Sequence, residues 1–237
     1  MNPLQARIHS WRKHARDLVT RVKEIRPWTA PDGYPIPPIR LRDKVRRGQI
    51  SREGFIREGR QVFDTIIGVL ERQGVNLDSG LRVYEFGCGC GRVARHFLQR
   101  KVSITGSDVD AELVAWCRGH LLPGEFLVNE FDPPLALPDD TFDVAYAISV
   151  FTHIPLDRQM PWLSELHRVL KPGGLALISI LQSEQSEPGR EAYAMSRPDP
   201  GIRRDWLGQD TAPAEYLDVF HSSEFIEREW TRFFRCR

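Results

Sequence analysis

The sequence has few cysteines, no long apolar run and almost no net charge. Its four cysteines, at positions 88, 90, 117 and 236, match neither a disulfide framework nor the paired Cys-x-x-Cys spacing of zinc sites. No stretch of roughly 18 apolar residues occurs, and the charged N-terminus lacks the apolar segment of a secretory signal. These absences predict a cytoplasmic protein with no disulfide scaffold, no bound metal and no transmembrane segment.

The net charge is only +1, but the basic and acidic residues are unevenly distributed along the chain. Residues 1–50 contain 12 Lys and Arg but only 4 Asp and Glu, so this leader carries +8 and the remainder −7. A basic leader on an acidic body predicts either an anionic partner or docking of the leader onto its own body. Aromatic residues are not interleaved with the basic ones, and the main body is acidic, so nucleic acid is not favoured as a partner.

The length of 237 residues suits one α/β domain with an appended segment. Residues 4–25 place apolar side chains on one helical face and basic ones on the other, which predicts an amphipathic helix. Five prolines between residues 26 and 38 then predict an extended arm. We expect residues 1–50 to form this helix and arm, and residues 51–237 to form the main domain. The amphipathic helix fits contact with a membrane surface, a cap over a substrate, packing or dimerisation.

Short apolar runs alternate with helical stretches after residue 80. Strands separated by helices predict βαβ crossovers, and hence a mostly parallel sheet with helices on both faces. Ligands of such sheets bind beyond the carboxyl ends of the strands. A helix is also expected before the sheet, at Arg52–Gln73. The predicted strands are Leu81–Phe86, Val102–Ser107, Glu125–Asn129, Phe142–Ser149 and Gly174–Leu181, and the helices between them are Gly91–Gln99, Ala111–Leu121 and Pro155–Leu170.

A glycine-rich turn directly follows the first predicted strand. Glycine permits positive φ and close backbone approach, and the next helix offers free N–H groups to a ligand. A dinucleotide-binding GxGxxG motif starting at Gly87 would need glycine at position 92, where Arg92 stands, and the third glycine is instead Gly91. Glu85 stands two places before Gly87, where its carboxylate can reach an ammonium group directly or through water.

A second carboxylate, Asp108, ends the second predicted strand, where it can accept hydrogen bonds from ribose hydroxyls. An Asp at this point can instead cap the following helix, and we expect Asp110 to take that role.

The ExGxGxG arrangement from Glu85 to Gly91 resembles motif I of class I methyltransferases. The runs FDVA at 142–145, SVFTHI at 149–154 and LSELHRVLKPGG at 163–174 resemble further motifs of bacterial members, so the likeness spans residues 81–181. It implies S-adenosylmethionine as the cofactor, with Asn129 preferred over Asp132 as the partner of the adenine amino group. The resemblance assigns cofactor binding to Glu85, Gly87, Cys88, Gly89, Asp108, Val109, Asn129 and Ser149.

Two histidines are candidates on the acceptor side. Methyl transfer from a sulfonium needs mainly alignment of the nucleophile, and a base only where the acceptor carries a proton of high pKa. His153 follows the fourth strand, where a base could face the methyl group or the ring could bond the loop backbone. His221 has the same two interpretations, because residues 182–223 are expected to form a lid or the acceptor pocket wall.

The sequence therefore predicts methyl transfer to a small oxygen or nitrogen nucleophile, such as a sugar or secondary metabolite. The alternative is a non-catalytic protein that binds S-adenosylmethionine, whereas Arg92 and the LKPGG run disfavour a dehydrogenase. The last predicted strand, Trp230–Cys236, has no following partner, so the usual final strand of seven is expected to be missing. A homodimer or another partner could bind through the N-terminal helix or this open sheet edge.

Overall fold

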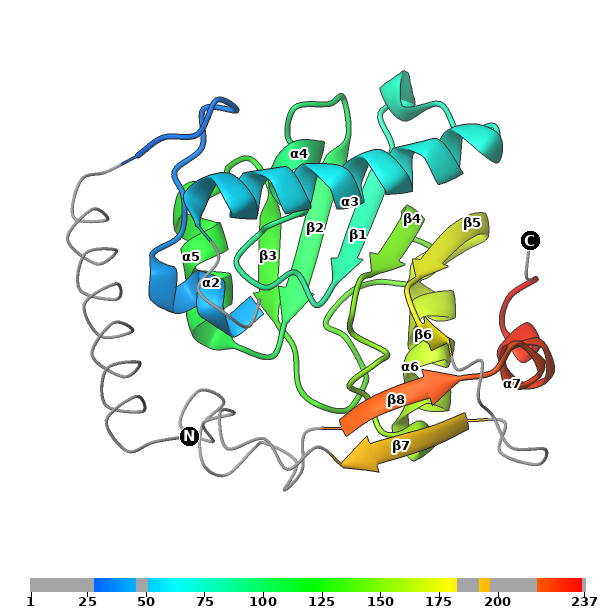
Figure 1. The fold of residues 1–237 in the computed structure, drawn as a ribbon. Helices are drawn as coiled ribbons and strands as arrows, with labels where there is room; N and C mark the ends of the chain where they lie inside the picture. The colour runs from blue at the N-terminus through cyan, green and yellow to red at the C-terminus, as the bar shows by residue number, and fades with distance from the viewer. Residues whose placement is uncertain (1–27, 46–50, 183–191, 197–216, 236–237) are drawn as a thin grey trace, which may run out of the picture.

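The fold is built on a five-stranded parallel sheet with the strand order β3-β2-β1-β4-β5 (Figure 1). The computed structural model describes residues 28–45, 51–182, 192–196 and 217–235. All four strand pairings are parallel, which confirms the predicted fold class. The strands are β1 (Arg82–Phe86), β2 (Ser103–Asp108), β3 (Glu125–Val128), β4 (Phe142–Ala147) and β5 (Leu170–Ile178).

The strand order reverses at β1, which lies between β2 and β4. Glu85 of β1 is in register with Gly106 on one side and Tyr146 on the other. In open α/β sheets the ligand binds outside the carboxyl ends of the strands at such a reversal. The structure therefore places the glycine-rich turn after β1 at the expected binding position.

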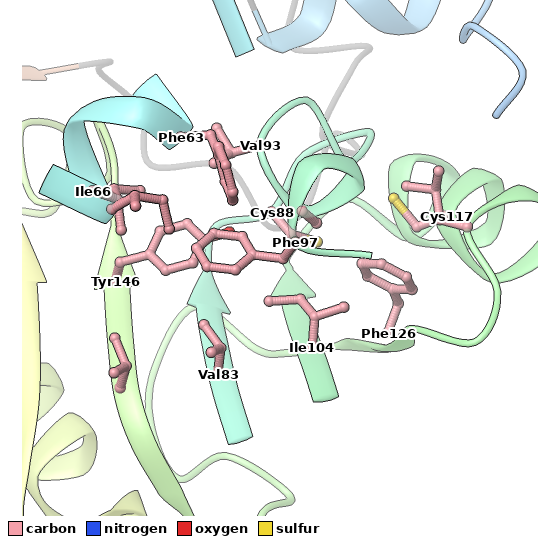
Figure 2. Packing of buried hydrophobic residues seen from close by; sticks show 14 of the residues in the cluster. Phe63, Ile66, Val83, Cys88, Val93, Phe97, Ile104, Cys117, Phe126 and Tyr146 are labelled. Carbon is pink, nitrogen blue, oxygen red and sulfur yellow. The ribbon is translucent and has the colours of Figure 1, made fainter. Parts of the chain in front are cut away.

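Helices cover both faces of the sheet, as predicted. One face packs against α3 (Arg52–Arg72), α4 (Ala94–Phe97) and α5 (Ala111–His120). On this face the rings of Phe63 and Phe97 meet edge to face at 4.9 Å, and Phe97 stacks on Tyr146 at 5.3 Å (Figure 2).

The opposite face packs against α6 (Leu156–Val169) and the C-terminal segment. The Trp162 ring of α6 lies 4.5 Å from that of Phe86, and Trp230 lies 5.4 Å from Phe151. These aromatic contacts tie the end of the described chain to the sheet.

An N-terminal arm, residues 28–45, packs on the first of these faces. It contains a Thr29–Pro35 bridge and the short helix α2 (Ile39–Val45), which lies beside α5 (Figure 1). Asp32 of the arm forms a bidentate ion pair with Arg95 of α4, with N···O distances of 2.6 and 2.8 Å. The predicted helix over residues 4–25 lies outside the described residues.

A second, smaller sheet has the order β6-β8-β7. Its strands are β6 (Leu181–Gln182), β7 (Ala192–Ser196) and β8 (Leu217–His221), and α7 (Ser223–Glu229) follows. Much of the predicted pocket wall over 182–223 lies outside the described residues. In the described part of the chain, no strand pairs with the outer edge of β5, and no helix is long and apolar enough to cross a membrane.

Three predicted element boundaries are wrong. The predicted strand Trp230–Cys236 begins instead with a 3₁₀ turn, η3 (Trp230–Arg232), because the indole of Trp230 is anchored in the core beside α6. The predicted helix 91–99 is reduced to α4, because Gly91 adopts a φ of +76° and delays its start. The strand predicted at Gly174–Leu181 begins earlier, because the helix predicted to end at Leu170 ends at Val169 and β5 starts at Leu170, with an irregular register across the Pro-Gly-Gly segment.

Candidate functional site

The glycine-rich turn wraps tightly over the end of β2. The backbone N–H groups of Gly87 and Cys88 both donate to the Ser107 carbonyl oxygen at 2.8 Å. Gly87 has a φ of +74°, and a Cβ atom there would lie 2.4 Å from Cγ2 of Val150. Gly89 has a φ of +54°, and its Cβ would lie 2.4 Å from Cγ1 of Val45. Only glycine lets two other segments approach the turn this closely.

Asp108 holds the turn from the end of β2. Its Oδ2 accepts a hydrogen bond from the Gly89 N–H at 2.8 Å, and its Oδ1 accepts from the Asp110 N–H at 2.9 Å. Burial raises the pKa of Asp108, and these backbone donors oppose that rise. Because each carboxylate oxygen has two lone pairs, both can still accept from a ribose hydroxyl. Asp110 caps α5, as predicted, by accepting from the N–H groups of Glu112 and Leu113.

Two further predicted residues carry buried oxygens that have no hydrogen-bond partner within the described part of the chain. Glu85 is 4% exposed, and its Oε2 is unpaired. Burial raises its pKa to about 8, against opposing contributions from Tyr146 and Arg92. Asn129 is 8% exposed; its Nδ2 donates to the Glu130 carbonyl, but its Oδ1 is unpaired. Buried oxygens of this kind are stabilised by a donor, such as an ammonium or an amino group.

The remaining predicted cofactor residues are Cys88, Val109 and Ser149. Cys88 lies within the turn and is buried, and a hydrogen bond with the Cys117 thiol together with burial raises the pKa of its own thiol. Val109 is half-buried and directly follows Asp108. Ser149, after β4, has a φ of +58°, which is uncommon outside glycine, and its N–H donates to the Ser179 hydroxyl at 2.7 Å. In the described residues, no group of three or more His, Cys, Asp or Glu could hold a metal.

His153, the candidate base, lies in the loop that joins β4 to α6. It is half-buried, and its backbone N–H donates to the Val150 carbonyl at 2.8 Å. Because the Val150 side chain also contacts the backbone of Gly87, this loop and the glycine-rich turn lie side by side.

The sequence of the central segment was compared with known families. Residues 83–174 match a family described as "Methyltransferase domain". The match covers less than half of the chain, so it shows a likeness of this segment to methyltransferase domains. Methyltransferases of this family use S-adenosylmethionine as the methyl donor, so the likeness implies this cofactor.

Two curated relatives and one solved structure show how far the likeness extends. A malonyl-[acyl-carrier protein] O-methyltransferase from Pectobacterium atrosepticum is 32% identical over 104 residues, covering 44% of this chain and 40% of the relative. A phosphoethanolamine N-methyltransferase from Triticum aestivum is 29% identical over 152 residues, covering 61% of this chain and 30% of the relative. The chain therefore spans less than half the length of these relatives.

The solved structure of the PH0226 protein from Pyrococcus horikoshii OT3 has the same fold. It superposes with a TM-score of 0.52 at 15% identity, covering 74% of this chain and 82% of that one.

Docking of the basic leader onto its own body was one of the two predicted alternatives, and the described part of the leader, residues 28–45, docks in this way. Lys44 of α2 forms ion pairs with Asp110 at 2.7 Å and Glu112 at 2.9 Å, and Arg40 pairs with Glu112 as well. Together with Val45 against Gly89, these contacts place α2 directly beside the turn. The charge asymmetry of the leader was the available signal, but it did not specify which acidic residues would be paired.

Proposed function

We propose that this chain is an S-adenosylmethionine-dependent methyltransferase whose acceptor is a small molecule with an oxygen or nitrogen nucleophile. The proposal is supported above all by acceptor oxygens on three neighbouring strands. Glu85 lies in β1, Asp108 ends β2, and Asn129 directly follows β3. S-Adenosylmethionine carries its donors in the matching order, from the ammonium group through the ribose hydroxyls to the adenine amino group.

The unpaired buried oxygens of Glu85 and Asn129 fit this cofactor. Glu85 would accept from the ammonium group, Asp108 from the ribose hydroxyls and Asn129 from the adenine amino group. Gly87 and Gly89 would let the cofactor approach the backbone, and Cys88, Val109 and Ser149 would line the same space. When bound, S-adenosylmethionine supplies a methyl group already activated on sulfur, so the protein has mainly to align the acceptor and exclude water.

We propose His153 as the general base for acceptors that must lose a proton of high pKa. Its support is its place three residues beyond Val150, whose side chain contacts Gly87 in the turn. A neutral imidazole at this position could take a proton from a hydroxyl or amine as the methyl group is transferred. An oxygen or nitrogen acceptor is consistent with the names of the two relatives, and a sugar or secondary metabolite falls within this class.

Calorimetric titration with S-adenosylmethionine and S-adenosylhomocysteine tests the cofactor assignment. Asp108→Ala and Asn129→Ala should each weaken binding by about tenfold or more, because each removes a buried acceptor. Asp143→Ala is the control for Asp108, since Asp143 pairs with Lys171 at the opposite ends of the strands. Asp132→Ala tests the alternative adenine partner and should leave binding unchanged, since Asp132 is 64% exposed and pairs with Arg158. Equal losses in these last two variants, or tight binding of NADH, would contradict the assignment.

Turnover distinguishes an enzyme from a protein that only binds the cofactor. Release of S-adenosylhomocysteine should be measured with a panel of small phenols, sugars, amines and carboxylic acids. Cofactor binding with an acceptor-dependent release supports the enzyme. Binding without release across this panel would favour the non-catalytic alternative.

A further inference from the structure

The loop after β4 is held by hydrogen bonds to its backbone carbonyl groups. Gln159, in the first turns of α6, donates from Nε2 to the carbonyls of Phe151 at 3.1 Å and Ile154 at 2.9 Å. The carbonyl of Thr152 accepts from the backbone N–H of Val219 in β8 at 2.8 Å. The conformation of this loop therefore depends on a helix beside it and on a strand from much later in the sequence.

His221, at the end of β8, completes this arrangement. Its Nε2 lies 2.9 Å from Oε1 of Gln159. Because both carbonyl partners of Gln159 can only accept, its amide nitrogen must face them and its amide oxygen must face His221. His221 must then donate from Nε2, which fixes the neutral Nε2–H tautomer.

The surroundings of His221 suit this neutral donor. The residue is fully buried, and its ring lies 5.9 Å from that of Phe225 and 5.4 Å from that of Trp230. Its Nδ1 has no partner among the described residues. Burial lowers the pKa of His221 to about 4, so it donates this bond as an uncharged group at neutral pH.

We propose that His221 is a positioning residue that acts through Gln159 to fix the loop Phe151–Ile154 on the acceptor side of the site. The inference extends the proposed methyltransferase function, because this loop carries His153 and adjoins Val150, which contacts Gly87. His221 does not touch the reacting groups. It orients the Gln159 amide, which in turn holds the two carbonyl groups on either side of His153.

Hydrogen exchange by NMR tests the proposal without a known acceptor. In His221→Phe the ring is kept but the donor is lost, so exchange of the His153 and Val219 amides should accelerate by roughly tenfold or more. His221→Gln places a terminal N–H at a similar reach and should restore much of the protection. His96→Phe is the matched control, because His96 is also buried, with a pKa lowered to about 4, but lies on the opposite face of the sheet. It should leave exchange in the loop unchanged.

A double variant tests whether His221 acts through Gln159. Gln159→Met should release the loop by itself, and adding His221→Phe should accelerate exchange no further. Additive effects would overturn the proposed coupling. In wild-type protein, long-range ¹H–¹⁵N spectra should show His221 protonated at Nε2 alone, and protonation at Nδ1 would also overturn it.

Cofactor binding separates this inference from the proposed function. His221→Phe should bind S-adenosylhomocysteine within about threefold of wild type, because the change lies outside the turn. With an acceptor found by product release, its kcat/KM should fall about tenfold or more while the KM for S-adenosylmethionine is retained. Uniform acceleration of exchange across β1 and β2 would mean a merely structural role and overturn the inference. Failure of the wild-type protein to bind S-adenosylhomocysteine would instead contradict the proposed function and leave the exchange results interpretable.

Discussion

Two buried histidines, which lie on opposite faces of the sheet, have similarly lowered pKa values. His96 and His221 are both buried, and desolvation lowers the pKa of each from 6.5 to about 4. His96 is packed against Phe63, and its Nε2 has no partner within the described residues. Protonation of either ring in the folded state would bury a charged imidazolium, and this desolvation destabilises the folded protein.

This ionisation predicts a loss of stability in mild acid. Between about pH 6.5 and 4 the unfolded chain takes up a proton at each histidine and the folded chain does not, so the free energy of unfolding falls as pH falls. Each histidine contributes up to about 1.4 kcal/mol per pH unit in this window. The check is urea unfolding of wild type and His96→Phe from pH 8 to pH 4.

The difference between the two proteins isolates the effect of His96. The stability advantage of wild type over His96→Phe should shrink as the pH falls below about 6.5, and stay constant from pH 7 to 8. Glu85, whose pKa is raised to about 8, has the opposite dependence, since its contribution is lost as pH rises. Glu85 is present in both proteins, so its effect cancels. A difference that does not vary with pH would show that His96 titrates normally.

At the scale of elements, the helix α3 has to come very close to the glycine-rich turn. Gly59 of α3 is buried, and a Cβ atom there would lie 2.2 Å from the backbone oxygen of Arg92. Gly68 in the same helix has only the flexible Arg72 side chain within reach, at 3.5 Å. The same substitution at the two positions should therefore have opposite effects.

Gly59→Ala should destabilise the protein by about 2 kcal/mol, because the clash with a backbone atom exceeds the helical advantage of alanine. Gly68→Ala should stabilise it by up to about 1 kcal/mol through helix propensity alone. Denaturant unfolding of both variants provides the measurement. Stabilisation by Gly59→Ala would show that the turn moves away from α3 at little cost.

Most elements of the central domain were predictable because their patterns are local. The strand predicted at Leu81–Phe86 corresponds to β1 at Arg82–Phe86. It was predictable because a short apolar run between two polar turns is typical of a buried strand. The C-terminal element was not predictable, because Ser222 starts α7 by accepting from the Phe225 N–H, whereas the aromatic residues after it alternate as in a strand. Tertiary burial of Trp230 decides between the two structures, and sequence pattern does not report it.

The residues of the candidate site likewise fall into those that the sequence predicted and those that it did not. Motif spacing predicted Glu85, Gly87, Gly89, Asp108 and Asn129 as cofactor residues, because all of them lie at or just beyond the ends of three consecutive parallel strands. The roles of Lys44, Gln159 and the His221 side chain were not predicted, since each depends on contact between segments far apart in sequence. Long-range contacts of this kind leave no periodic signal.

At the scale of the whole molecule, the N-terminal arm is attached to the domain by a buried ion pair. Asp32 and Arg95 have side chains that are 10% and 1% exposed, and Arg95 also donates to the carbonyls of Tyr34 and Pro35. The guanidinium beside Asp32 lowers the pKa of that carboxyl, although burial alone would raise it. Removal of one member of a buried pair leaves the other charge uncompensated.

Asp32→Ala should therefore destabilise the protein by about 3 kcal/mol. The control is Asp64→Ala, which removes a pair with Arg60 whose side chains are more than half exposed, and it should cost less than about 1 kcal/mol. Urea unfolding at pH 7 measures both. Similar small losses would indicate that the arm contributes little to the stability of the domain.

The contact between β8 and the loop after β4 also sets an order for events during synthesis. The glycine-rich turn, Asp108 and α5 are all translated by the middle of the chain, and the arm that packs on them is translated before them. Gln159 has emerged soon afterwards, but its partner His221 is translated only after the whole of β5. A nascent chain therefore contains the glycine-rich turn and Asp108 well before Gln159 can acquire its partner His221.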